Sequence, residues 1–345
     1  MKDDKPPRIG VIGAGAWGTA LGNLLAEKGY EVDLWVREQE VYDQIKNKQI
    51  NETFLPGIAL TPSLNPVRTF EEALVDKNIA LIVVPSHVFR NVLSDMRPHL
   101  PEGISLITAT KGIENHSLKI MSQVAEDVLP KEYAEHFSCL AGPSFAKEVA
   151  RRLPAAVTIA CRDLNHAEAL QKIFSADYFR VYTSDDLVGI QLCGALKNVI
   201  AIAAGASDGL GFGLNTRAAL ITRGLAEITR LGVAMGANPL TFAGLSGMGD
   251  LILTCTGDLS RNRTVGLKIA QGMSLQDITA GVDTVAEGIK TALSAYELAN
   301  KMGVDMPITN QVYEVLYKGK DPNQAVREHM ARALKSELEP HFNGL

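Results

Sequence analysis

The chain has 345 residues, of which 46% are hydrophobic, and a formal net charge of -5 at pH 7. It is long enough to bury a large core, and its length predicts two domains. The acidic balance and the lack of a Lys/Arg-rich stripe argue against a nucleic-acid partner. The four cysteines are widely spaced without metal-ligand spacing, so we expect reduced packing residues, no metal site and a cytoplasmic location.

The first informative pattern is glycine-rich and lies near the N-terminus. Gly13, Gly15 and Gly18 stand between an apolar run at residues 9–12 and an amphipathic pattern at residues 17–28. In such a strand, turn and helix, the first glycine permits the tight turn, the second lets a pyrophosphate approach the backbone, and the third lets the helix pack on the strand. The helix N-terminus favours the anion. The spacing predicts a dinucleotide site, with a glycine-rich structural turn as the alternative.

The same stretch also has features of a signal peptide or a membrane span. Residues 9–26 carry no charge and follow Lys5 and Arg8. However, five glycines and Asn23 make a poor apolar helix, and neither a small-residue cleavage site nor a second apolar run of spanning length follows. We therefore expect a soluble chain without stable membrane insertion.

Short apolar runs alternate with helical patterns as far as residue 183. The strand candidates cover residues 9–12, 31–35, 80–84, 105–109, 138–141, 156–160 and 179–183. This alternation predicts an α/β fold with a doubly wound, mainly parallel, Rossmann-like sheet. Ligands of such sheets bind beyond the carboxyl ends of the strands, so we expect the active site at that edge.

Beyond Asp185 the strand-like runs end, and Ala- and Leu-rich segments recur with a helical period. The predicted helices cover residues 187–206, 214–235, 263–271, 287–302 and 307–317. They indicate a C-terminal all-helical domain. We divide the chain into a dinucleotide-binding domain of residues 1–186 and a helical domain of residues 187–345 that carries the substrate and catalytic groups.

The second predicted strand leads into Arg37, where an acidic residue would hydrogen-bond the ribose of NAD. An arginine accommodates the 2′-phosphate of NADP, so Arg37 favours NADP(H). Glu38 beside it leaves open that Arg37 is only a solvated residue at the strand end. Asp33, within the strand, has no functional explanation in the sequence.

Lys197 is the sharpest candidate of the helical half. Residues 187–206 are nearly all apolar or small, and a charged amine is expensive to bury there unless it has a partner or a task. Desolvation would lower its pKa toward the range of a general acid. The alternative is that the lysine extends to the helix surface. Asn198 beside it and the Gly/Ala-rich surroundings favour the catalytic role.

Two polar residues follow predicted strands. Lys111 follows the strand at residues 105–109, a position suited to ligand contact. Ser144 follows the strand at residues 138–141, where it can cap the next helix. Capping alone is one role for Ser144, and an anion site at the capped helix is the other.

A polar cluster lies in the helical half, at Asp250, Thr254, Ser260, Arg261 and Asn262. Ser260 can cap a helix whose first residues include Arg261 and Asn262, which would make a receptor for a phosphate dianion. The alternative is that Arg261 and Arg263 are ordinary surface charges.

Together these residues resemble the NAD(P)-dependent glycerol-3-phosphate dehydrogenases of the bacterial type, from Ile9 to about Tyr317. The matching motifs are Gly13-Ala-Gly-Ala-Trp-Gly-Thr-Ala20, Val84-Pro-Ser-His87, Thr110-Lys-Gly-Ile-Glu114, Ala141-Gly-Pro-Ser-Phe-Ala146, Ala195-Leu-Lys-Asn-Val199, Gly247-Met-Gly-Asp-Leu251, Ser260-Arg-Asn-Arg263 and Val285-Ala-Glu-Gly288. Several motifs in one order are far more specific than a single glycine-rich loop. The tail after Tyr317 matches no motif of the family.

The resemblance implies reduction of dihydroxyacetone phosphate to sn-glycerol 3-phosphate by NADP(H) or NAD(H), which supplies glycerophospholipid synthesis, with Lys197 as the acid/base. It implies substrate contacts at Lys111, Gly142, Ser144, Asp250, Ser260, Arg261 and Asn262, to which we add Asn198 and Thr254. We expect Asp250 and Asn198 to orient Lys197 and the substrate. It implies dinucleotide contacts at Ala16, Trp17, Arg37, Lys111, Ala146, Arg261, Val285 and Glu287, besides the three glycines. Because the position of Arg37 varies within the family, the resemblance leaves the choice of cofactor open.

Two other functions fit the same domain plan. One is a 2- or 3-hydroxyacid dehydrogenase in which Arg261 binds a carboxylate, and the other is a non-catalytic dinucleotide sensor. Lys197 and Asp250 argue against the sensor, which would need no amine in the helical domain. Fold alone does not separate these functions. We expect a small-molecule substrate, and a homodimer is the default expectation for the assembly.

Overall fold

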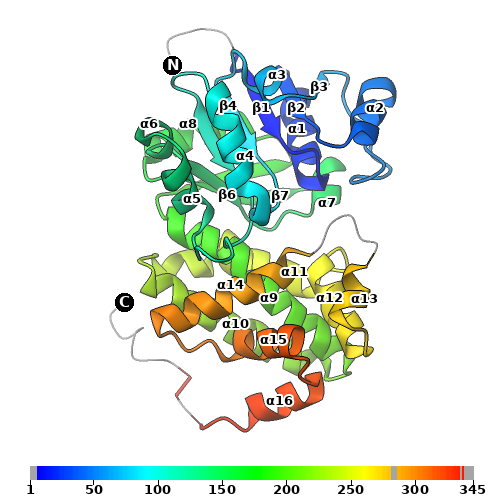
Figure 1. Ribbon diagram of the computed structural model, residues 1–345, viewed down its shortest axis with the longest axis vertical. Coiled ribbons are helices and arrows are strands. Elements are labelled where there is room, and N and C mark those ends of the chain that lie inside the picture. Colours follow the sequence, from blue (N-terminus) through cyan, green and yellow to red (C-terminus); the bar gives the residue numbers. More distant parts are fainter. Residues whose placement is uncertain (1–5, 281–285, 335, 338–345) are drawn as a thin grey trace.

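The computed structural model describes residues 6–280, 286–334 and 336–337. They form an α/β half around an open sheet and a second half built of helices (Figure 1). Within these residues, eight strands form one sheet in the order β3-β2-β1-β4-β5-β6-β7-β8. Their bounds are β1 Ile9–Ile12, β2 Val32–Trp35, β3 Leu64–Val67, β4 Ile79–Ile82, β5 Ser105–Thr108, β6 Ser138–Ala141, β7 Ala155–Ala160 and β8 Phe179–Ser184.

The doubly wound, mainly parallel sheet is confirmed. All neighbouring strands run parallel except β6 and β7. The seven predicted strands are present, and their ends differ from the predicted ones by at most two residues. The eighth, β3, was missed because it contains Pro66, which is tolerated here because β3 pairs only with β2 at the edge of the sheet.

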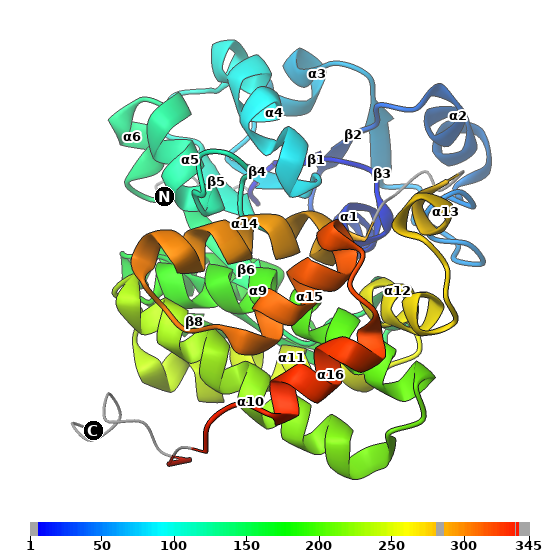
Figure 2. The same ribbon diagram turned by 60° about the horizontal axis from the view of Figure 1, so that its bottom comes forward.

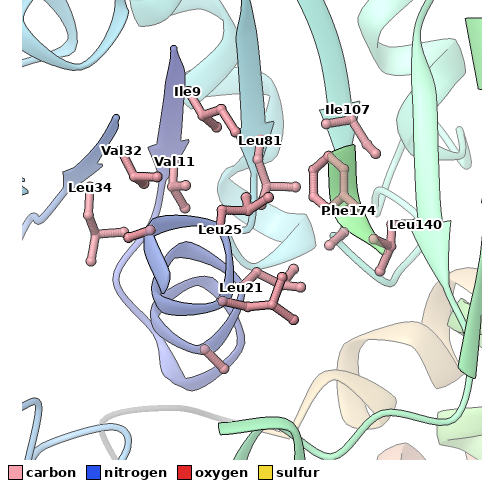
Figure 3. Close-up of a cluster of buried hydrophobic side chains, with 14 of the residues drawn as sticks. Ile9, Val11, Leu21, Leu25, Val32, Leu34, Leu81, Ile107, Leu140 and Phe174 are labelled. Carbon is pink, nitrogen blue, oxygen red and sulfur yellow. The ribbon is translucent and has the colours of Figure 1, made fainter. Parts of the chain in front are cut away.

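Helices cover both faces of the sheet, as a mainly parallel sheet requires. They are α1 Ala16–Glu27, α2 Gln39–Lys48, α3 Phe70–Leu74, α4 Phe89–Met96, α5 Met121–Val128, α6 Lys131–Ala134, α7 Ala146–Ala150 and α8 Leu164–Phe174. On one face, Leu21 and Leu25 of α1 point toward the strands beside Val11 and Leu81 (Figure 3). On the other face, α3, α4 and α5 bury Leu74, Phe89 and Met121 in a separate cluster.

The second half is helical over its described residues. Its helices are α9 Leu187–Gly209, α10 Gly213–Ala234, α11 Asp250–Thr256, α12 Arg261–Ala270, α13 Leu275–Thr279, α14 Glu287–Met302, α15 Pro307–Lys318 and α16 Pro322–Met330. The helix α9 is central, because α10, α11, α12, α14 and α15 all pack on it (Figure 2). The five longer helices were predicted, whereas α11, α13 and α16 are too short for periodicity to reveal them.

The central helix corrects one expectation. With 23 residues and a mean hydropathy of 1.7, α9 is long and apolar enough to cross a membrane, although no second run of spanning length was expected. However, 89% of its apolar window is buried inside the protein. The apolar character of α9 is therefore that of a core helix.

The two halves share packing at their junction. β7 runs antiparallel to β6, and β8 runs parallel to β7. The carboxyl end of β8 therefore lies on the same side of the sheet as the amino end of β6, and α9 starts there. The first two turns of α9 pack on the sheet through Leu187 and Ile190. Conversely, Ile113 and Ile120, from the segment after β5, lie in the core of the helical half. The division between residues 186 and 187 therefore stays a proposal.

A buried carboxylate joins two helices of the second half. Glu227 of α10 accepts hydrogen bonds from the backbone N–H groups of Ile308 and Thr309 at the start of α15, at 2.6 and 3.1 Å. Burial raises the pKa of Glu227 to about 7, although the backbone hydrogen bonds oppose this shift. The four cysteines are buried and free, as expected of packing residues.

Candidate active site

The glycine-rich turn between β1 and α1 has the predicted local geometry. Gly13 has a φ of 116°, and a Cβ there would lie 2.5 Å from the carbonyl oxygen of Val83. A Cβ on Gly18 would lie 1.9 Å from the carbonyl oxygen of Gly13, so Gly18 is what lets α1 pack on the turn. By contrast, a Cβ on Gly15 would meet no atom within 4 Å, which leaves room for a ligand against the backbone. The turn therefore fits a pyrophosphate at the start of α1.

Lys197 of α9 meets two polar partners from α11. Its Nζ lies 3.0 Å from Oδ1 of Asp250 and donates a hydrogen bond to Oγ1 of Thr254 at 2.6 Å. The other oxygen of Asp250 pairs with Nζ of Lys111, which follows β5, at 2.9 Å. One carboxylate thus joins two ammonium groups that are 86 positions apart in the chain. The lysine does not extend to solvent, since only 6% of Lys197 is exposed.

The charge state of Lys197 follows from its surroundings. Burial lowers its pKa from 10.5 to about 8, because the interior disfavours an ammonium ion. The carboxylate of Asp250 opposes this effect, and the positive charge of Lys111 adds to it. A pKa near 8 lets the amine donate and accept a proton near neutral pH, as a general acid/base requires.

Asn198 has a different role from the one expected. Its Nδ2 donates to the carbonyl oxygen of Gly194 at 3.4 Å, and its Oδ1 accepts from Nδ2 of Asn262 at 2.9 Å. In turn, Oδ1 of Asn262 accepts from the N–H of Gly288 at 2.9 Å. Asn198 therefore positions Asn262 and the start of α14, and it does not orient Lys197 through any hydrogen bond found among the described residues.

The predicted anion receptor at the start of α12 is formed by the helix itself. Ser260 is the N-cap, and its Oγ accepts from the N–H of Arg263 at 3.2 Å. Arg261 begins the helix and is exposed, whereas Asn262 is buried. Arg263 is not an ordinary surface charge, because its guanidinium pairs with Asp208 at 2.8 Å. The helix N-terminus therefore presents Arg261 and Asn262 together with free N–H groups.

Ser144 does not cap a helix, which corrects the prediction. The next helix, α7, begins at Ala146 with Phe145 as its N-cap and no side-chain cap. The Oγ of Ser144 instead donates to the carbonyl oxygen of Gly142 at 3.0 Å, and Lys111 donates to the same oxygen at 3.4 Å. Gly142 has a φ of 146°, and a Cβ there would lie 2.8 Å from Cα of Val157. This strand end is thus a tight turn beside Lys111.

The other expected dinucleotide contacts lie around the glycine turn and the domain junction. Ala16 and Trp17 begin α1, and Nε1 of Trp17 is buried without a hydrogen-bond partner among the described residues. Ala146 begins α7, which packs on α1. Arg37 is largely exposed just after β2 and pairs with Glu38 at 2.6 Å. Val285 lies outside the described residues.

One contact across the junction was not predicted. Oγ of Ser86, just after β4, donates to Oε2 of Glu287 at the start of α14, at 2.7 Å. Burial raises the pKa of Glu287, although the hydrogen bond from Ser86 opposes this shift. A Cβ on Gly112 would lie 2.4 Å from the side chain of Ser86, so three segments meet closely here. Ser86 stands in one of the matched motifs, which was the available signal.

Asp33 now has a structural explanation. It lies near Nζ of the buried Lys77, and its Oδ1 accepts from Nδ2 of Asn65 at 2.6 Å. It therefore joins β2 to β3 and to the segment before β4, away from the carboxyl ends of the strands. Among the described residues, no group of three or more His, Cys, Asp and Glu could hold a metal ion.

Relatives of known name cover nearly the whole chain. The chain is 57% identical over 330 residues to a glycerol-3-phosphate dehydrogenase [NAD(P)+] of Geobacter sulfurreducens, covering 96% of this chain and 98% of that one. It is 54% identical over 339 residues to the enzyme of the same name from Syntrophobacter fumaroxidans, covering 98% and 99%.

Solved structures agree with these relatives. Glycerol-3-phosphate dehydrogenase from Coxiella burnetii superposes with a TM-score of 0.90 at 38% identity, covering 94% of this chain and 99% of that one. A D-mandelate dehydrogenase, at 16% identity and a TM-score of 0.61 and covering 92% and 99%, shares the fold alone. No feature of the comparisons supports the hydroxyacid alternative.

Two family models match almost end to end. The model of the NAD-dependent glycerol-3-phosphate dehydrogenase N-terminus matches residues 8–167, and that of the C-terminus matches residues 186–327. The first contains the glycine turn and Lys111, and the second contains Lys197, Asp250 and the start of α12. The chain therefore belongs to the NAD-dependent glycerol-3-phosphate dehydrogenase family.

Proposed function

We propose that the chain is an NAD(P)-dependent glycerol-3-phosphate dehydrogenase that reduces dihydroxyacetone phosphate to sn-glycerol 3-phosphate and catalyses the reverse reaction. The observation that carries the proposal is the buried amine of Lys197, which Asp250 and Thr254 hold at 3.0 and 2.6 Å. A buried ammonium with a pKa near 8 serves proton transfer to and from an oxygen atom. A dinucleotide sensor would not need this group.

In the reduction, the dihydronicotinamide supplies a hydride to C2 of the substrate when it is bound. Lys197 donates a proton from Nζ to the carbonyl oxygen, so the carbonyl gains one hydride and one proton and becomes the alcohol. The carboxylate of Asp250 stabilises the ammonium before transfer, and Lys111 shares the same carboxylate. The buried ammonium also stabilises the negative charge that develops on the carbonyl oxygen. In the oxidation, neutral Lys197 accepts the hydroxyl proton.

We assign the phosphate of the substrate to the start of α12. The helix N-terminus offers free N–H groups, and Arg261 and Asn262 add a guanidinium and an amide. We further assign Ser260, Lys111, Gly142, Ser144 and Thr254 to the walls of the substrate site, with Asn198 acting through Asn262. These assignments follow the family resemblance and the positions described above.

We assign the cofactor to the glycine turn and the domain junction. Its contacts are Gly13, Gly15, Ala16, Trp17, Gly18, Arg37, Lys111, Ala146, Arg261, Val285 and Glu287. The open space at Gly15 supports a ligand there. Arg37 supports a preference for NADP(H). We also propose a cytoplasmic homodimer whose product supplies glycerophospholipid synthesis.

The test of this function is turnover by a Lys197→Ala variant. We expect turnover to fall at least about 100-fold, as for other positioned acids. Binding of NADPH, followed by fluorescence titration, should persist because Lys197 lies outside the glycine turn. Lys301→Ala removes an exposed lysine of α14 and is the matched control. A Lys197→Ala variant that keeps more than about a third of wild-type turnover would contradict the proposal, because the loss of a general acid should lower turnover far more.

A substrate panel separates the remaining alternative. NADPH and NADH oxidation should be followed with dihydroxyacetone phosphate, glyoxylate and ketopantoate side by side. We expect turnover with dihydroxyacetone phosphate to exceed both acids by orders of magnitude. Preference for either acid would favour a hydroxyacid dehydrogenase with Arg261 on the carboxylate.

A further inference from the structure

The two arginines that flank Asn262 have different surroundings. Arg261 is exposed in the first turn of α12, whereas the side chain of Arg263 is 14% exposed. The Nε and Nη2 atoms of Arg263 lie 2.9 and 2.8 Å from Oδ2 of Asp208, which is near the end of α9. The charge of Arg263 is thus directed at a carboxylate of this chain.

The same carboxylate also binds α10. Nε and Nη2 of Arg217 lie 2.8 and 2.7 Å from Oδ1 of Asp208. Each oxygen of Asp208 therefore faces one guanidinium, and the Asp208 side chain is 7% exposed. Two N–H groups of each guanidinium converge on one carboxylate oxygen, and such charge-assisted contacts are stronger than neutral hydrogen bonds. Asp208 joins α9, α10 and α12 at one point.

The contact between α9 and α12 explains why such a point is needed. A Cβ on Gly205 would lie 2.0 Å from the carbonyl oxygen of Arg263, and a Cβ on Gly266 would lie 2.0 Å from that of Ile202. The two helices therefore touch backbone to backbone. Glycine permits this approach, but it offers no side chain that interlocks with the opposite helix and resists sliding. Val265 and Ile269 of α12 pack with Val199 and Ile202 of α9 beside this contact, and buried polar contacts add directional restraints on the start of α12.

Two polar contacts do so from opposite directions. Asn262 holds Asn198 at 2.9 Å, and the neighbouring residue Arg263 holds Asp208, about 15 Å farther along α9 at 1.5 Å per residue. We propose that Asp208 is a positioning residue, which through Arg263 keeps the N-terminus of α12 at the place where it binds the substrate phosphate. This inference rests on the proposed function. Lys197 is held separately by Asp250 and takes no part in the contacts of Asn262 and Arg263.

The test is the isosteric variant Asp208→Asn. Without the carboxylate, the start of α12 loses one of its two polar restraints, and a shift of about 1 Å is enough to weaken a positioned contact severely. We expect the KM for dihydroxyacetone phosphate and the Ki of inorganic phosphate to rise about tenfold, while kcat stays within about twofold and the KM for NADPH rises less than that for the substrate, because Arg261 at the start of α12 is also assigned to the cofactor. Asp258→Asn is the matched control, because Asp258 also pairs with Arg263, at 3.0 Å, but is 96% exposed.

A structural defect would give a different pattern. The kcat/KM for unphosphorylated dihydroxyacetone should not change in Asp208→Asn, since that substrate does not use the phosphate site. Equal proportional losses for both substrates, or a folded variant with an unchanged KM, would overturn the inference. Arg263→Lys, which keeps the charge but not the fork, is expected to show the same selective loss and replaces Asp208→Asn if that variant does not fold. Binding of inorganic phosphate, measured by calorimetry, tests the inference independently of activity. Inactivity of the wild type on dihydroxyacetone phosphate would refute the proposed function and leave the inference to this binding test.

Discussion

Replacement of Asp250 by Asn removes the charge that keeps Lys197 protonated. At 3.0 Å and an effective dielectric constant of about 20, the attraction between the two charges is worth at most about 5.5 kcal/mol. Since 1.4 kcal/mol shifts a pKa by about one unit, even a quarter of this attraction would be measurable. The nearby ammonium of Lys111 keeps lowering the pKa of Lys197 after the substitution. We therefore expect this pKa to fall from about 8 to below about 7 in Asp250→Asn.

The sign of the effect on activity follows from the direction of the reaction. Reduction uses the protonated amine, so its rate falls as the pH rises through the pKa of Lys197. The midpoint of this loss should move to lower pH in Asp250→Asn, and the oxidation should lose its dependence on pH above neutrality. The pH profile of kcat/KM measures this midpoint, because it reports groups of the free enzyme. Titration of the substrate phosphate, at a pKa of about 6, cancels in the ratio of variant to wild type.

Thr254→Val is the matched control for this experiment. It removes a hydrogen bond of 2.6 Å to the same ammonium without removing a charge, so the midpoint should move much less. A midpoint that stays in place or rises in Asp250→Asn would refute the electrostatic argument. It would also show that another group titrates in the wild-type profile.

Three further predictions follow from single side chains. Arg261→Ala should raise the KM for dihydroxyacetone phosphate by about tenfold or more and affect unphosphorylated dihydroxyacetone little, because a charge-assisted contact to phosphate is lost; equal losses for both would argue against phosphate binding. Arg37→Asp should shift the ratio of kcat/KM from NADPH toward NADH, since a carboxylate repels the 2′-phosphate; an unchanged ratio would mean that Arg37 points away from the adenosine. Glu227 has a folded pKa of about 7, above its usual 4.5, so its contribution of about 3 kcal/mol is present below pH 4.5 and is lost as the pH rises through 7. The unfolding temperature of Glu227→Gln should therefore depend less on pH than that of the wild type. The control Glu297→Gln, at an exposed position, should show the same pH dependence as the wild type. Equal pH dependence of the unfolding temperature in Glu227→Gln and the wild type would contradict the argument.

Local patterns were sufficient to predict most of the elements. The strands and the long helices follow from apolar runs and helical periods that each lie within one segment of chain. The edge strand β3 was missed because Pro66 argues against a strand, and only a strand at the edge of the sheet tolerates it. The cap at Ser260 was predicted correctly because N-capping depends only on the next turn of the helix, whereas the cap at Ser144 was wrong because α7 begins one residue later than that role needs.

Contacts between distant segments were beyond the sequence alone. The cost of burying Lys197 indicated that it needs a partner, but the identity of Asp250 depends on how α11 crosses α9. In the same way, Arg263 has the same residue type as Arg261 and lies two positions from it, yet the packing of α12 on α9 turns it toward Asp208. Side-chain type suggests a chemical task, and only the packing of helices decides which residue performs it.

The length of α9 between its first residue and Lys197 sets the position of the catalytic amine relative to the sheet. It starts at the carboxyl end of β8, which lies on the same side of the sheet as the amino end of β6. Lys197 comes ten residues after Leu187, about 15 Å along the helix axis. A single residue inserted before Lys197 would rotate its side chain by about 100° and advance it by about 1.5 Å, away from Asp250. An inserted turn would restore the direction but not the distance. The number of residues between Leu187 and Lys197 is therefore fixed by the geometry of the sheet, independently of which apolar residues fill those positions.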